Sequence, residues 1–294
     1  MKRVYLIIVG SALILGTIEV ALKFTDGSFD PFQITFLRFI IGGLVLLPFA
    51  VDEYKKQPKG FMKKRLWVSM LLLGAVFVPF CMMLFQFGVI NSNAATAAVI
   101  FCSNPIFTML FANFMTDNDK MNRQKIVSMS LGVAGLILIV SPWDMQEGNT
   151  LIGVVYLIGA AAAFGFYSVL GSRTVGRVGV FTQTSTSFII GAMILFCIML
   201  LMNRPIFTGV AENIGIILYI GIIVTGGGFA LYFLAMKYTN PTTASIVFLL
   251  KPIIAPIFAV ILLGEAITRN MLFGIGLLLV ASYTLTFKKL SRTH

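Results

Sequence analysis

The chain has 294 residues, of which 58% are hydrophobic and only 11% are charged, and its mean hydropathy is +0.96. A soluble domain carries about 25% charged residues, so this composition excludes an ordinary soluble protein and indicates an integral membrane protein. The net charge of +11 does not predict nucleic-acid binding, because the basic residues lie in short gaps between apolar segments. The three cysteines lack CxxC spacing and the only histidine is the last residue, so we expect no metal ion and no cofactor.

Ten apolar segments follow one another along the chain, and each is long enough, at about 20 residues, to cross a bilayer. The gaps between them are short and contain turn-forming pairs such as Asp30-Pro31 and Asn240-Pro241. The first segment is followed by Lys23-Phe24-Thr25, which is no small-residue cleavage site, so we expect a retained span rather than a signal peptide. The fold class predicted is an all-α membrane protein with ten transmembrane helices. Their expected limits are 4–22, 31–51, 66–88, 93–115, 124–141, 151–170, 181–202, 213–236, 242–263 and 270–287.

The lysines and arginines of the gaps are distributed unequally between the two sides of the membrane. With the amino terminus inside, 17 of them fall in the inner gaps and at the termini, and 3 fall in the outer gaps. Because inner loops carry an excess of positive charge, we expect both termini in the cytoplasm and the protein in the plasma membrane. The basic gap from Lys55 to Arg65 is most simply a determinant of this topology.

An internal repeat relates the two halves of the chain. Displacement by 147 residues gives 11 identities in the 53 pairs from Leu66 to Asn118. Each half then has five spans, and an odd number makes the second half enter the membrane from the opposite side. The sequence therefore predicts inverted repeats over residues 1–145 and 146–294, an architecture typical of secondary transporters. The identities under this displacement include three that apolar composition does not explain, namely Asn93 with Asn240, Thr96 with Thr243, and Pro105 with Pro252.

These features together resemble the ten-helix EamA-type branch of the drug/metabolite transporter superfamily. The resemblance is carried by the two five-helix halves, by Arg38 early in the second span, by the Pro105 and Pro252 segments, and by the ending Leu262-Leu263-Gly264-Glu265. It implies a central substrate cavity built from spans 1–4 and 6–9, with spans 5 and 10 peripheral, and export of small metabolites. The chain has Asp117-Asn118 where the family often ends its fourth span with Gly/Glu-type residues.

Two charged residues lie in the outer part of the first two spans. Glu19 could bind a cationic substrate group or a proton, or it could reach water or Lys23 one helical turn away. Arg38 could pair with Glu19 at the outer mouth of a cavity. The alternative for Arg38 is a structural arginine that holds helix ends, which we favour because the matching residue in the second half is Ser187.

The third charged residue is Lys251, in the middle of the ninth span and directly before Pro252. Its counterpart in the first half is Asn104, so both halves place a polar side chain before a proline. Lys251 could attract a carboxylate or a phosphate, or it could form an ion pair with Glu19 or contact a freed carbonyl group. We favour a side chain that faces the cavity.

The candidate site is completed by uncharged polar residues and by prolines that are expected to bend helices. Polar side chains inside spans are commonly interhelical hydrogen bonds, and some could equally contact a substrate. The candidates for substrate binding or coupling are Glu19, Arg38, Gln86, Asn104, Tyr167, Tyr232 and Lys251, and the expected helix bends are Pro105, Pro252 and Pro256.

The function predicted is a secondary transporter that exports a small polar metabolite, such as an amino acid, by alternating access. Proton coupling through Glu19 is a hypothesis, and we expect a monomer or weak dimer that contacts the lipid bilayer and a small-molecule substrate. The alternatives are a transporter of a cationic choline-like amine or drug, or a facilitator without coupling. An enzyme is not expected, because the spans contain no aspartate and the chain has no catalytic cluster.

Overall fold

The computed structural model describes residues 2–25, 27–57, 64–116, 120–141, 145–239 and 247–290. Every regular element in these ranges is a helix. Eight of the described helices are long and apolar enough to cross a membrane, and two further described apolar helices are shorter. The eight are Leu6–Lys23, Pro31–Lys55, Lys64–Ile90, Ala94–Met115, Arg123–Val140, Leu151–Val178, Val180–Leu201 and Ile214–Tyr238, and the two are Leu250–Leu263 and Arg269–Ala281.

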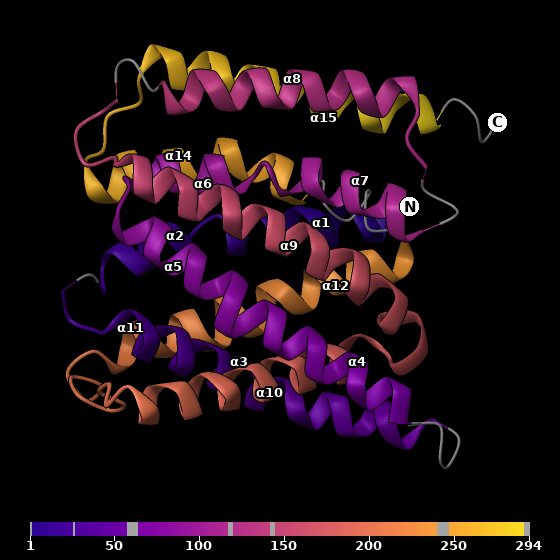
Figure 1. Ribbon diagram of the computed structural model, residues 1–294, viewed down its shortest axis with the longest axis vertical. Helices are drawn as coiled ribbons and strands as arrows, with labels where there is room; N and C mark the ends of the chain where they lie inside the picture. Colours follow the sequence, from indigo (N-terminus) through magenta and orange to yellow (C-terminus); the bar gives the residue numbers. More distant parts are fainter. Residues whose placement is uncertain are drawn as a thin grey trace.

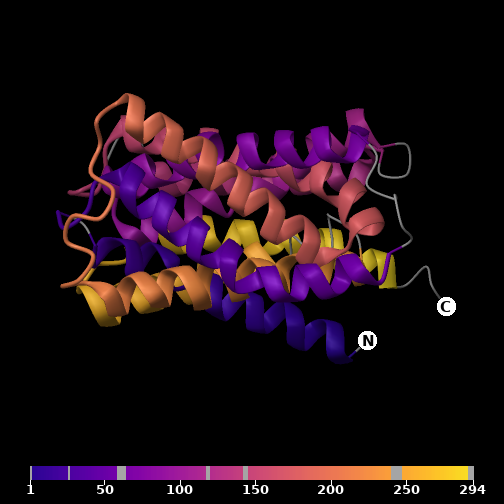
Figure 2. The same ribbon diagram turned by 90° about the horizontal axis from the view of Figure 1, so that it is seen from below.

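The helices lie side by side as a bundle, with the ends of the chain on one side of it (Figures 1 and 2). We call the end of the bundle where α1 begins the terminal end, and the other the distal end. The first half contains α1 (Lys2–Leu15), α2 (Ile18–Lys23), α3 (Pro31–Lys55), α4 (Lys64–Ala75), η1 (Val76–Met82), α5 (Met83–Ile90), α6 (Ala94–Phe101), α7 (Asn104–Met115) and α8 (Arg123–Val140). The second half contains α9 (Leu151–Val178), α10 (Val180–Leu201), α11 (Ile214–Leu218), η2 (Tyr219–Gly228), α12 (Phe229–Tyr238), α14 (Val247–Leu263) and α15 (Arg269–Leu290).

The expected segments agree with these helices at most boundaries to within two or three residues. The main difference is α9, which continues to Val178 although the expected segment ended at residue 170. This extension is polar and ends at Gly179, whose φ of 95° lies in the left-handed region that favours glycine. Apolar content alone therefore underestimated the helix. Residues 242–246 of the ninth expected segment lie outside the described residues.

Several helices are interrupted within the bundle. A break at Gly16-Thr17 separates α1 from α2, and a break at Cys102-Ser103 separates α6 from α7, which begins with Asn104-Pro105. Both η1 and η2 are π-helical, a geometry that often occurs at functional sites. In the ninth span α14 continues as one helix through Pro252 and Pro256, and the bends expected at these two prolines stay a prediction. A proline removes one hydrogen bond, and a helix packed inside a protein can tolerate that loss.

Helices α8 and α15 form a pair at one edge of the bundle (Figure 1). Ser128 Oγ donates to the Ala281 carbonyl at 2.6 Å. Gly135 and Gly274 face each other so closely that a Cβ on Gly135 would lie 2.8 Å from the Gly274 carbonyl oxygen. The pair therefore packs through backbone and small residues, and it corresponds to the spans 5 and 10 that the resemblance placed at the periphery.

Helices α3 and α10 form a second close pair, which joins the two halves of the chain. At the distal end the Arg204 guanidinium lies 3.1 Å from the Asp30 carboxylate. Gln33 Nε2 donates to two carbonyls beyond α10, those of Ile206 at 3.1 Å and Thr208 at 2.7 Å. In the membrane interior Ser185 Oγ donates to the Gly43 carbonyl at 2.7 Å. These contacts hold the two helices together along their length.

Candidate functional site

Glu19 and Lys251 form an ion pair in the interior of the bundle. The break at Gly16-Thr17 places Glu19 in the first turn of α2, and its Oε1 accepts a hydrogen bond from the Lys251 ammonium group on α14. The two side chains are 0% and 1% exposed. The structure thus pairs Glu19 with Lys251, 232 residues away in the chain, rather than with Arg38 or Lys23. Such a pair offsets part of the desolvation cost of both charges.

Arg38, by contrast, has no carboxylate partner among the described residues. Its side chain on α3 is 0% exposed, and none of its three guanidinium nitrogens finds an acceptor within the described ranges. The guanidinium carbon lies over two aromatic rings, 4.8 Å from the centroid of Phe39 and 5.8 Å from that of Phe85. Cation–π contacts contribute about 0.5–2 kcal/mol, whereas a charge at membrane depth costs roughly 3 kcal/mol or more. Arg38 is therefore incompletely compensated.

The two cations lie in the same region, because they share one aromatic neighbour. Lys251 Nζ is 5.8 Å from the Phe85 centroid, as is the Arg38 guanidinium carbon. At most twice that distance separates the two charges. Lys251 also lies 5.4 Å from the centroid of Phe101. We call Glu19, Arg38 and Lys251 the charged cluster.

Asn104 and Gln86 lie beside the rings that flank the charged cluster. Asn104 Nδ2 donates to the Phe101 carbonyl at 2.9 Å, which satisfies a backbone group at the α6–α7 break. Its Oδ1 and the Oε1 of Gln86, the residue after Phe85, are buried without a hydrogen-bond partner in the described chain. Buried polar atoms of this kind are uncommon in folded proteins and call for an explanation such as a ligand or water.

Tyr167 and Tyr232 lie outside the charged cluster, although both are fully buried. The Tyr232 hydroxyl donates to Ser168 Oγ at 3.1 Å, and the Tyr167 hydroxyl lies 3.4 Å from Ser187 Oγ. Their hydroxyl groups are therefore used between helices. In the structure the two residues are part of the packing around the site.

An aromatic cluster connects the two tyrosines with the charged cluster. Phe164 lies at its centre, with its ring centroid 5.5 Å from Phe101, 6.1 Å from Tyr167 and 5.7 Å from Tyr232. The Tyr167 ring also stacks on Phe77 of the π-helical segment η1 at 4.1 Å. The interior thus has a charged part and an aromatic part in contact with each other. The members of the aromatic cluster are Phe39, Phe77, Phe85, Phe101, Phe164, Tyr167, Phe188, Phe229, Tyr232, Phe233 and Phe248.

Glu265 joins the two halves at the distal end. This residue follows α14, and its carboxylate accepts hydrogen bonds from the backbone N–H groups of Ala94 at 2.7 Å and Ala95 at 2.9 Å. These N–H groups belong to the first turn of α6, where a carboxylate is favoured both by hydrogen bonding and by the helix dipole. Glu265 stands out in the sequence as part of the family-like ending, but its partner could not be read from the sequence.

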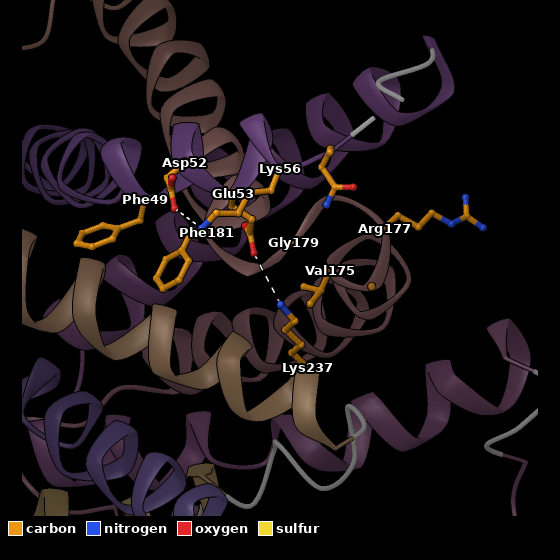
Figure 3. Close-up of a pocket in the computed structure, with 11 residues that line it drawn as sticks. Phe49, Asp52, Glu53, Lys56, Val175, Arg177, Gly179, Phe181 and Lys237 are labelled. Carbon is orange, nitrogen blue, oxygen red and sulfur yellow. Dashed lines mark hydrogen bonds and ion pairs between the residues drawn. The ribbon is translucent and has the colours of Figure 1, made fainter. Parts of the chain in front are cut away.

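Glu53 makes a similar junction at the terminal end, and sequence reasoning missed it. Its carboxylate accepts from the N–H groups of Val180 at 3.0 Å and Thr182 at 2.9 Å in the first turn of α10. Lys237 of α12 reaches toward it at 3.9 Å across a pocket of about 410 Å³ (Figure 3). The sequence shows an acid, Glu53, at the end of one apolar segment and a glycine, Gly179, before another. It does not show that the two lie close together.

The comparisons with known proteins agree with this architecture. The model of the EamA-like transporter family matches residues 2–141 and 151–287. An uncharacterized transporter of Clostridium kluyveri is 34% identical over 289 residues, which cover 96% of this chain and 92% of that protein. The S-adenosylmethionine uptake transporter of Rickettsia prowazekii is 24% identical, with 94% and 90% covered. A crystal structure with 18% identity has the same fold, with a TM-score of 0.72 and 98% of each chain covered. The chain therefore belongs to the EamA-like transporter family.

Proposed function

We propose that this membrane transporter moves a small polar metabolite, such as an amino acid, by alternating access around the charged cluster, with export as the leading direction. One observation carries the proposal: three charged side chains from α2, α3 and α14 lie in one buried region of the bundle. Charges at membrane depth mark substrate or ion pathways. Because α14 comes from the second half and the other two helices from the first, relative motion of the halves would alter this site directly.

We further propose that the two halves are inverted repeats of five spans, residues 1–145 and 146–294. The displacement of 147 residues brings the π-helical segment η1 onto the end of η2, and the family model matches the chain in two segments of similar length. Both observations support a duplication. The excess of lysine and arginine in the gaps at the terminal end supports a cytoplasmic location for that end, in the plasma membrane.

The contacts between the halves suggest which parts move. The α3–α10 pair is held at its distal end by Gln33 and Asp30, and at its terminal end by Glu53. The α6–α14 contact is held at its distal end by Glu265. We propose that the α3–α10 pair is the axis of rocking and that the α6–α14 contact opens. In this arrangement the distal side is closed, and release of Glu265 from α6 opens it.

A cationic substrate is the principal alternative, together with transport in the opposite direction. One relative is named an S-adenosylmethionine uptake transporter, so uptake is the alternative to export for this chain. A choline-like amine would need an acidic site with an open aromatic cage. Here the Glu19 carboxylate is already bound by Lys251, which favours a substrate that carries negative charge or both charges.

The proposal is tested by a ligand screen followed by a transport measurement. Purified protein is screened by thermal unfolding against amino acids, sugars, nucleosides and quaternary amines, because a ligand of the folded state raises its stability. A hit is then tested for counterflow in proteoliposomes. Lys251→Ala should abolish both signals, and Ser130→Ala, on the exposed face of the edge helix α8, should retain them. Counterflow that survives in Lys251→Ala would contradict a site at the charged cluster.

Proton coupling is tested separately with Glu19→Gln. Glu19 interacts electrostatically with Lys251, Arg38 and the Cys102 thiol. Replacement of its carboxylate removes the one acidic group of the charged cluster. If Glu19 carries the coupled proton, the variant should bind the hit and lose the effect of a pH gradient on transport. An unchanged effect of the gradient would refute coupling through this residue.

A further inference from the structure

The buried charges of the described ranges do not balance. Glu19 is the one buried carboxylate there, and the buried cations are Arg38, Lys125 and Lys251. Lys125 lies near the terminal end of α8, where its ammonium group donates to the Lys120 carbonyl at 3.1 Å. The charged cluster in the interior therefore holds two positive charges and one negative charge. One positive charge remains uncompensated when Glu19 is ionised.

The uncompensated charge is that of Arg38. Lys251 is bound to Glu19, whereas Nε, Nη1 and Nη2 of Arg38 are buried and lack an acceptor in the described chain. A guanidinium presents its donors in the plane of a rigid fork. The nearby rings of Phe39 and Phe85 offer π-faces to this cation but no acceptor for its N–H groups. Buried charges are normally paired, and the described chain supplies no partner for this one.

We propose that Arg38 binds a carboxylate group of the transported metabolite, so that the substrate class is carboxylates, including amino acids, rather than amines. This inference rests on the proposed transport function and names the substrate class of the same site. A carboxylate matches the guanidinium fork with two parallel hydrogen bonds. It also neutralises the single excess charge, whereas a phosphate ester carries about −1.5 to −2 at neutral pH and would leave the site negative.

The surroundings of Arg38 suit such a ligand. The second cation of the charged cluster, Lys251, adds a positive field from across the same Phe85 ring. The unpartnered Oε2 of Glu19 and Oε1 of Gln86 can accept hydrogen bonds from polar groups elsewhere on the metabolite. The aromatic cluster next to them makes the surroundings apolar, and a low local dielectric strengthens the contact between guanidinium and carboxylate. Arg38 is thus the anion receptor, and the pair of Glu19 with Lys251 is its neighbour.

The test compares the full-length protein with Arg38→Gln in the absence and presence of matched probes. The probes are acetate, propionate, benzoate and L-alanine, together with propionamide, benzamide and ethylamine, which have similar shapes but no carboxylate. Without ligand, Arg38→Gln should raise the midpoint of thermal unfolding, because an unpaired buried charge is removed. Arg123→Gln, which removes the same charge from an exposed position on α8, should leave the midpoint nearly unchanged.

With ligand, at least one carboxylate probe should stabilise the unaltered protein and its amide should not. The affinity for that probe should fall by on the order of 10- to 100-fold in Arg38→Gln, as expected for the loss of a charge-assisted hydrogen bond. A lower unfolding midpoint of Arg38→Gln without ligand, no response to any carboxylate probe, or an equal response to ethylamine would each overturn the proposal.

The same proteins separate this inference from the proposed transport function. Counterflow of a screened hit together with absence of Arg38-dependent carboxylate binding would overturn the carboxylate receptor and leave the transport proposal standing. Arg38-dependent binding of a carboxylate that shows no counterflow would support the receptor and contradict transport of that ligand through this site.

Discussion

The ion pair between Glu19 and Lys251 allows a quantitative test of the charged cluster. Both side chains are almost completely buried, and removal of one partner of a buried pair costs about 3–5 kcal/mol because the other charge is left uncompensated. Glu19→Gln should be the more destabilising change, since it leaves the two cations Lys251 and Arg38 without any carboxylate. Lys251→Met should cost less, because the Glu19 carboxylate still experiences the charge of Arg38.

The double variant Glu19→Gln/Lys251→Met removes both charges with little change in volume, and it should be about as stable as the unaltered protein. The expected coupling energy is therefore about 3 kcal/mol or more, measured as a double-mutant cycle by titration of the protein in mixed micelles with a denaturing detergent. If the two single changes add within about 0.5 kcal/mol, the two side chains do not interact and the described arrangement of the charged cluster is wrong.

Two further changes test the contacts around the site. Glu265→Gln weakens the two hydrogen bonds that the N–H groups of Ala94 and Ala95 donate to a charged acceptor, each worth about 1.5–3 kcal/mol. The change should increase the reactivity of a cysteine placed at Ala98 in α6 toward a membrane-impermeant thiol reagent; unchanged reactivity would argue against the distal closure. Gly274→Ala places a Cβ at 2.6 Å from the Gly135 carbonyl oxygen and should destabilise the protein by about 1–3 kcal/mol. Gly276→Ala, which meets nothing within 4 Å, is its control, and equal effects of the two would contradict the described packing of α8 against α15.

Much of the architecture could be predicted because hydrophobic length is a local property. A segment must cover the bilayer core with apolar residues, so composition alone located most helices to within a few residues. Glu19, Arg38 and Lys251 could also be recognised from the sequence, because a charged residue stands out inside an apolar segment. Where the helix continued beyond apolar sequence, as α9 does to Val178, the prediction ended too early.

The sequence offered Glu19 either Arg38 or Lys251 as a partner and could not decide between them, because pairing depends on how helices rotate and tilt against one another. The structure shows the pair of Glu19 with Lys251, which was the alternative to a cavity-facing lysine, and it leaves Arg38 without a carboxylate among the described residues. The caps that Glu265 and Glu53 make on distant helices are of the same kind. The sequence by itself determined which residues lie in the membrane. The tertiary structure decided which cation is left without a carboxylate. The packing of α2, α3 and α14 brings Glu19 within hydrogen-bond distance of Lys251 and not of Arg38.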